Sequence, residues 1–210
     1  MLTKRSLVEQ IQRLLEGALP STTDSAFTFN YVLSFVNSAI ATLAKQSALE
    51  NSNLEGCTYA SDEFNVKYTG VTLTKDINGE YSALLPQMPI GLPKGRGLVK
   101  VAPGNNSKSV AFKPISTKDI DLVLSLPEIH NKAYYYLSNG KVWFISCKAL
   151  FPKTVDITMV ASGVNDLDEN LLIPEDAQSA IVDIVFNKLI RREGQDLTND
   201  GAALDSNGAR

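Results

Sequence analysis

The chain has a single histidine and two widely separated cysteines, and these shortages exclude several kinds of site. The 210 residues include one His, His130, and two Cys, Cys57 and Cys147. A single histidine cannot form a two-histidine metal centre, and cysteines so far apart cannot form a CxxC zinc or redox motif. The two thiols are expected to be reduced and packed. A serine or cysteine nucleophile would need His130, whose surroundings are typical of a surface connection. We therefore expect a protein that is not an enzyme, with no cofactor and no metal site.

Long apolar runs are also missing. No run approaches the roughly 18–20 residues that a membrane span requires. The start, Met1–Arg5, leads into an amphipathic pattern that Glu9 and Arg13 interrupt, so a secretory signal peptide is not expected. With 44 % hydrophobic and 20 % charged residues and a net charge of −3, the composition is that of a globular protein. The length suits one domain or two small ones.

Residues 6–48 show helical periodicity and predict two helices. Ser6 and Glu9 have the spacing of a capping box with Ser6 at the cap, and Gly17 and Pro20 end the first helix. In the second helix, apolar residues repeat every three or four positions from Phe27 to Leu43. Two helices joined by a short connection are expected to pack as an antiparallel hairpin.

Residues 57–161 change to a period of two and predict a sheet. Phe64, Val66 and Tyr68 alternate with polar residues, and residues 155–159 supply another strand. The clearest hairpin spans 133–147, where Asn139-Gly140 fits a type I′ turn. Residues 116–119 are expected to cap a short helix that ends near Leu126.

From residue 166 the pattern returns to helix. Pro174 with Glu175 and Asp176 marks a helix start, and Gly194 marks its end. Residues 194–210 contain two isolated leucines and little else to bury, so the sequence predicts an extended arm.

These patterns predict an α+β fold. Two N-terminal helices and the C-terminal helix form an antiparallel helical bundle, into which an antiparallel β-sheet or small barrel is inserted, followed by a flexible C-terminal arm. The expected boundaries are 1–56 and 166–193 for the bundle, 57–165 for the β-rich insertion and 194–210 for the arm.

Local motifs for ligand chemistry are incomplete. Gly91–Gly97 has neither Walker A nor dinucleotide spacing, and a strand-like segment follows it instead of a helix. The acids Asp166, Asp168 and Glu169 resemble the start of a calcium loop, but the required later glycine and glutamate are missing. A carboxylate-dependent hydrolase has no local support and remains an alternative.

Charge is unevenly distributed. Residues 61–114 carry seven Lys/Arg against four acids, a balance of +3, and residues 166–210 carry four against ten, a balance of −6. The basic side chains could meet phosphates and Tyr134–Tyr136 could stack on bases; the candidates are Lys94, Arg96, Lys100 and Lys108. A solvated sheet face is the preferred interpretation, and a nucleic-acid-binding β module is the alternative.

The order of parts, helices, β insertion, helix and polar tail, resembles the head-to-tail adaptor (connector) proteins of tailed bacteriophages. Leu84–Val99 is similar to segments of structural ring proteins of crAss-like phages. So are Ile173–Arg192 and Leu197–Gly201. Together these segments cover about a fifth of the chain.

The resemblance implies a structural virion protein that forms a homo-oligomeric ring, commonly of twelve copies, between the portal protein and the tail. DNA would pass through its lumen without specific binding, and further neck or tail rings would contact it. The implied location is the virion neck, with the host cytoplasm as the place of assembly. Another neck or tail completion protein is the alternative, and copy number and ring position stay open. The implied portal-docking candidates are Ile190, Arg191, Arg192, Leu197 and Leu204.

Overall fold

The chain folds into two compact units. The computed structural model describes residues 2–18, 27–55, 60–77, 79–104, 110–125, 132–145, 151–163, 166–171, 173–174 and 176–205, without the side chains of residues 18, 55, 94 and 192–205. Met1–Ser47 and Ser162–Arg210 form one unit, here called the helical unit. Ala48–Ala161 form the other, the sheet unit. The predicted α+β fold with an inserted sheet is confirmed.

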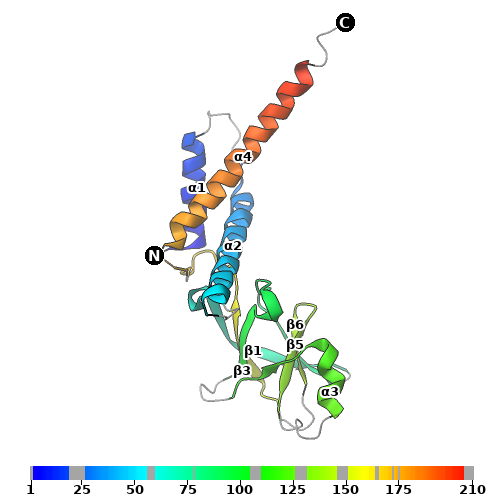
Figure 1. Ribbon diagram of the computed structural model, residues 1–210. Coiled ribbons are helices and arrows are strands. Elements are labelled where there is room, and N and C mark those ends of the chain that lie inside the picture. The colour runs from blue at the N-terminus through cyan, green and yellow to red at the C-terminus, as the bar shows by residue number, and fades with distance from the viewer. Residues whose placement is uncertain are drawn as a thin grey trace. The chain divides into compact units, whose positions relative to one another are not determined.

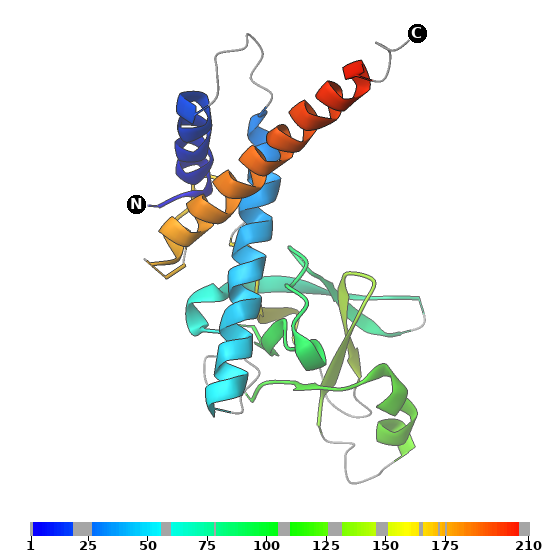
Figure 2. The same cartoon turned by 45° about the horizontal axis from the view of Figure 1, so that its top comes forward.

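Three helices build the helical unit: α1 (Lys4–Ala18), the first part of α2 (Phe29–Glu55) and α4 (Ala177–Asp205). Both views show α1 and α2 running in opposite directions, with α4 crossing them (Figures 1 and 2). Among the described helices, α1 packs most closely on α4. The apolar faces expected from the periodicity are buried, with fully enclosed side chains at Leu7, Ile11, Val32, Val36, Ile40, Ile181, Val185 and Leu189.

Two predicted helix boundaries are wrong: the start of the first helix and the end of the last helix. The first helix begins at Lys4, because Thr3 and Ser6 exchange the two bonds of a capping box: each backbone N–H donates to the other's hydroxyl. Ser6 is therefore not the cap. The end predicted at Gly194 is also wrong, since α4 continues to Asp205, and residues 194–205 are helical instead of extended.

The segment before α4 lies along the start of α1. Leu171 N–H donates to the Leu2 carbonyl and Arg5 N–H donates to the Leu167 carbonyl. Gly163 has φ +85°, and a Cβ atom there would collide with Leu171 Cδ1 and stand 3.1 Å from Lys4 Cε. Lys4 is 5 % exposed, and its burial lowers the pKa of the ammonium group. This close packing fixes the path of the chain into α4.

The sheet unit is built on seven described strands in the order β3-β7-β1-β2-β6-β5-β4. A short helix, α3 (Ile120–Ser125), follows a 3-10 turn and connects β4 to β5. The strands are β1 (Asn65–Lys75), β2 (Tyr81–Leu84), β3 (Leu98–Pro103), β4 (Lys113–Pro114), β5 (Tyr134–Ser138), β6 (Lys141–Ile145) and β7 (Thr154–Val160).

The sheet bends into a nearly closed, barrel-like form. The long strand β1 pairs with β7 through its first part and with β2 through its last part. The register shifts between Tyr68 and Val71, where Gly70 has φ +70°. The two ends of the strand order meet, because Phe112 N–H donates to the Val101 carbonyl of β3. One pair, β4 with β5, is parallel, so the expectation of a wholly antiparallel sheet is wrong at that position.

Two local predictions in the sheet unit are confirmed. Strands β5 and β6 form the expected hairpin, and the turn residues Asn139 and Gly140 have φ of 51° and 72°. The hydroxyl of Ser116 accepts from the Lys118 N–H and caps the turn that leads into α3.

Candidate functional site

A half-open cavity of about 270 Å³ lies in the sheet unit. It lies where α3 faces the β2, β6 and β5 strands and the turn before β2. We call it the aromatic pocket because five of its ten lining residues carry aromatic rings. The lining residues are Gly79, Glu80, Tyr81, Ile120, Leu124, Tyr136, Trp143, Phe144, Ile145 and Phe151.

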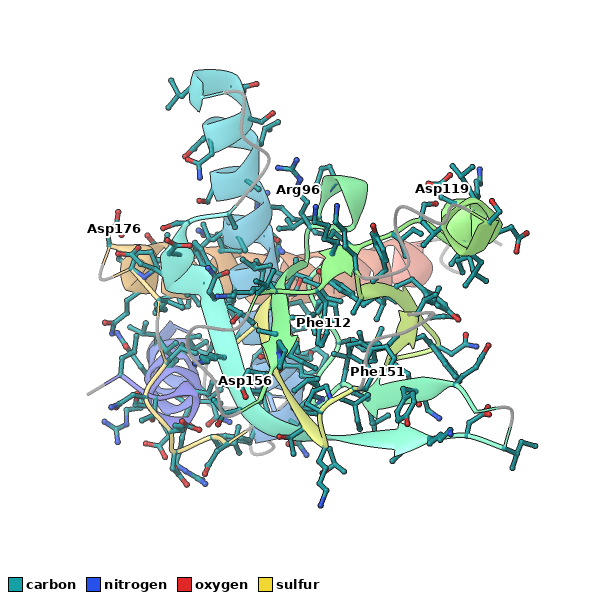
Figure 3. All side chains as sticks on the ribbon, turned by 90° about the horizontal axis from the view of Figure 1, so that it is seen from below. Arg96, Phe112, Asp119, Phe151, Asp156 and Asp176 are labelled. Carbon is teal, nitrogen blue, oxygen red and sulfur yellow. The ribbon has the colours of Figure 1, made fainter. Side chains whose placement is uncertain are left out.

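The floor of the aromatic pocket is continuous with the core of the sheet unit. Phe151 stands 4.9 Å from Tyr81 and 5.8 Å from Phe144, measured between ring centroids. Phe112 extends the cluster, 5.2 Å from Phe144 and 6.2 Å from Phe151. Figure 3 shows Phe112 and Phe151 among the strands, with Asp119 out on the segment that leads into α3. Packing of this kind holds the lining rings in fixed positions.

The outer rings of the pocket are presented by the β5–β6 hairpin. Tyr136 and Trp143 are opposite each other in the register, and their rings stack with centroids 6.5 Å apart at an angle of 15°. Lys141 Nζ stands 5.8 Å from the Trp143 ring centroid, and Lys75 Nζ stands 5.5 Å from that of Tyr81. The faces of these rings therefore already attract cations.

Glu80 is the one charged side chain among the described residues that line the pocket. Its side chain is exposed and enters no ion pair within 4.0 Å among the described residues. Burial raises the pKa of the Tyr136 phenol, and the negative charge of Glu80 raises it further. The carboxylate thus acts electrostatically on a pocket ring, and the combination of acid and aromatic faces favours a positively charged ligand group.

The predicted portal-docking residues all lie on α4. Ile190 is half-buried and Arg191 is exposed. The backbone of Arg192, Leu197 and Leu204 is helical, and their side chains lie outside the described set. Nothing in the described part of the chain tests their docking role, which stays a prediction.

The predicted basic residues are only partly described. Lys100 is exposed on β3, and Arg96 is half-buried in the turn before that strand. Lys94 is described by its backbone alone, and Lys108 lies outside the described residues. Strand pairing adds Lys67 of β1, which was not among the basic candidates from the sequence. Lys67 and Lys100 of β3 pair with the same residue of β7, Thr158, from its two sides.

Other sequence candidates are distributed as follows. Tyr135, one of the three tyrosines considered for stacking on bases, is 4 % exposed and belongs to the core. His130, Cys57 and Cys147 lie outside the described residues.

Within the described ranges, no group of three or more His, Cys, Asp or Glu is placed to hold a metal ion. None of the helices described here has the length and apolarity needed to cross a membrane.

The aromatic pocket itself was missed by sequence reasoning. Its rings come from Tyr81, the β5–β6 hairpin and Phe151, and only the hairpin was visible as a local pattern. Comparisons do not supply the missing information, since no protein-family model matches the chain and no curated protein is detectably similar to it.

Proposed function

We propose that this chain is a structural subunit of a bacteriophage neck, forming an adaptor ring between the portal and the tail. The proposal rests on the resemblance to head-to-tail connector proteins described above. The architecture fits that expectation: a helical unit made from both ends of the chain contains an inserted sheet unit. The role requires surfaces for neighbours and no catalytic group.

The observation that carries the proposal is the length of α4. With 29 residues it spans roughly 44 Å, twice the length of the 15-residue α1 on which it packs. Among the described side chains of α4, the buried ones lie between Ala177 and Leu189, and the side chains from Arg192 onwards lie outside the described set. Both views show its C-terminal half running on past α1 (Figures 1 and 2). That half therefore needs a support other than α1.

An unsupported helix of this composition is marginal in water. Gly194 and Gly201 lie inside α4, and each glycine costs about 1 kcal/mol relative to alanine. Helices of this length depend on packing of an apolar face more than on propensity. Positions Ile190, Leu197 and Leu204 recur every seven residues, so in a continuous helix they follow one face. A portal subunit that covers this face would complete the helix.

Electron microscopy of the purified chain tests the proposal, both alone and mixed with the portal protein of the same virus. The expected result is closed rings seated coaxially on the portal, and the ring image also gives the copy number. Absence of rings in both samples, at concentrations where the chain is folded by circular dichroism, contradicts the proposal. Rings that bind the tail but not the portal would instead favour another neck or tail completion protein.

A further inference from the structure

We propose that the aromatic pocket binds a basic side chain, arginine or lysine, presented between apolar residues of a partner polypeptide. The chemistry follows from the lining: electron-rich ring faces of Tyr136 and Trp143 beside the carboxylate of Glu80. The inference does not depend on the neck assignment, because it uses only the described side chains of the sheet unit.

Charge complementarity selects the cation. A guanidinium or ammonium group gains from both an aromatic face and a nearby carboxylate. Glu80 forms no ion pair within 4.0 Å among the described residues, so its charge is available to a ligand. The pocket's rings attract cations within the chain as well, since Lys75 and Lys141 each lie over one of them.

The apolar part of the ligand is selected by the remaining lining. Ile120 and Leu124 of α3 face the rings across the recess, and Leu124 is 46 % exposed. A volume of about 270 Å³ accommodates one long side chain with part of its neighbours. Proline-rich peptides dock on aromatic-lined grooves of small domains in a similar way.

Single-stranded nucleic acid could also stack on exposed rings, but the charges around the pocket oppose it. The bordering elements carry four acids, Asp76, Glu80, Asp119 and Asp121, against three lysines, Lys75, Lys118 and Lys141. Two of those lysines are already placed over rings. Binding of a phosphate backbone depends on an excess of positive charge, and the described residues of these elements do not supply one.

The single tryptophan of the chain lines the pocket, so its fluorescence reports occupancy. The full chain is titrated with an N-acetylated, C-amidated hexapeptide that carries one arginine between leucine and proline. A second peptide has neutral citrulline in place of the arginine. We expect a saturable change in Trp143 emission with the arginine peptide and at least tenfold weaker binding of the citrulline peptide.

Two variants separate the carboxylate from general charge effects. Glu80→Gln is expected to weaken binding of the arginine peptide about tenfold. The matched control Glu63→Gln removes an exposed acid of the sheet unit that does not line the pocket, and is expected to bind as the parent chain does. Circular dichroism shows whether both variants keep the fold.

Four results would overturn the inference. Equal binding of the arginine and citrulline peptides would remove the role of the cation. Unchanged affinity in a folded Glu80→Gln chain would remove the role of the carboxylate. Saturable binding of a ten-residue oligothymidine that displaces the peptide would assign the pocket to nucleic acid. An absence of any saturable change up to millimolar peptide also rejects the site, while ring formation on the portal is judged separately by microscopy.

Discussion

Arg5 and Asp168 are far apart in the sequence, yet their side chains join the start of α1 to the segment before α4. The guanidinium donates two hydrogen bonds to the carboxylate, of 2.5 and 3.1 Å. Hydrogen bonding to Arg5 lowers the pKa of Asp168 below its ordinary value of 3.8. Asp166 and Asp168 suggested the start of a calcium loop in the sequence. No local pattern could have indicated that an arginine at position 5 is the partner.

The lowered pKa of Asp168 has a defined consequence for acid stability. A carboxylate whose folded pKa is depressed stabilises the fold above its unfolded value, near 3.8, and this contribution is lost as pH falls through the lowered value. We expect Asp168→Asn to lower the thermal midpoint slightly at pH 7, because the pair is exposed. The difference from the parent chain should shrink below pH 4 and disappear at lower pH.

Thermal melts monitored by circular dichroism from pH 7 to pH 2.5 measure this effect. Glu169→Gln is the matched control, since it neutralises an adjacent exposed acid that has no bond to Arg5 among the described contacts. If Asp168→Asn shows the same pH dependence as the parent, the ion pair does not contribute to folding.

Alanine substitutions at Gly163 and Gly17 are expected to change the free energy of unfolding in opposite directions. Alanine at this position must adopt φ +85° and place its Cβ against Leu171 and Lys4. We expect Gly163→Ala to lower the free energy of unfolding by about 2–4 kcal/mol, combining backbone strain with overpacking. Gly17→Ala, in α1 with open space around it, should raise that free energy by about 0.5–1 kcal/mol. Urea titrations followed by helical circular dichroism compare the two, and equal effects would show that the described packing at Gly163 is wrong.

Among the elements, α4 departs most from its sequence pattern. Glycine is a poor helix former and a frequent stop signal, which is why Gly194 predicted an end. The structure continues for eleven residues beyond it. Local propensity is a weak prior that context overrides, and a single sequence contains no information about the surface on which a helix continues.

Truncation of α4 separates folding from docking. Deleting residues 194–210 removes no buried position of the described core, so the helical signal per remaining residue and the thermal midpoint should change little. Binding to the portal should weaken at least tenfold, because the continuous stripe of positions 190, 197 and 204 is interrupted. Deleting only 206–210 leaves α4 complete and serves as control. Sedimentation with immobilised portal measures both, and full docking by the longer deletion would refute the role of the helix end.

The strands show which parts of a sheet a sequence can specify. The β5–β6 hairpin was predictable because Asn139-Gly140 fixes the turn and the register follows from it. The bend at Gly70 was not, since the alternation of Phe64, Val66 and Tyr68 does not indicate how residues 65–75 are paired. They belong to a single strand that changes partner from β7 to β2. The parallel β4–β5 pair and the aromatic pocket likewise depend on pairings between distant segments.

At the scale of the whole molecule, the proposed ring requires each copy to contact its neighbours through two different surfaces. Such head-to-tail contacts form a closed ring only when the rotation between neighbouring copies is 360° divided by a whole number. That whole number is the copy number of the ring. Assembly also stabilises the folded state by mass action. If rings form as proposed, the thermal midpoint should therefore rise with protein concentration, in agreement with the microscopy.

The helical unit is made from two separated stretches of chain, and this has a consequence during protein synthesis. The sheet unit, residues 48–161, is continuous and can fold as soon as it has been translated. Helix α1 must wait for α4, roughly 2–9 s later for the 44 residues from 162 to 205, at about 5–20 residues per second. A chain that stops before Ile181 leaves the apolar face of α1 uncovered and recognisable to chaperones and proteases. Incomplete products are thereby marked for removal.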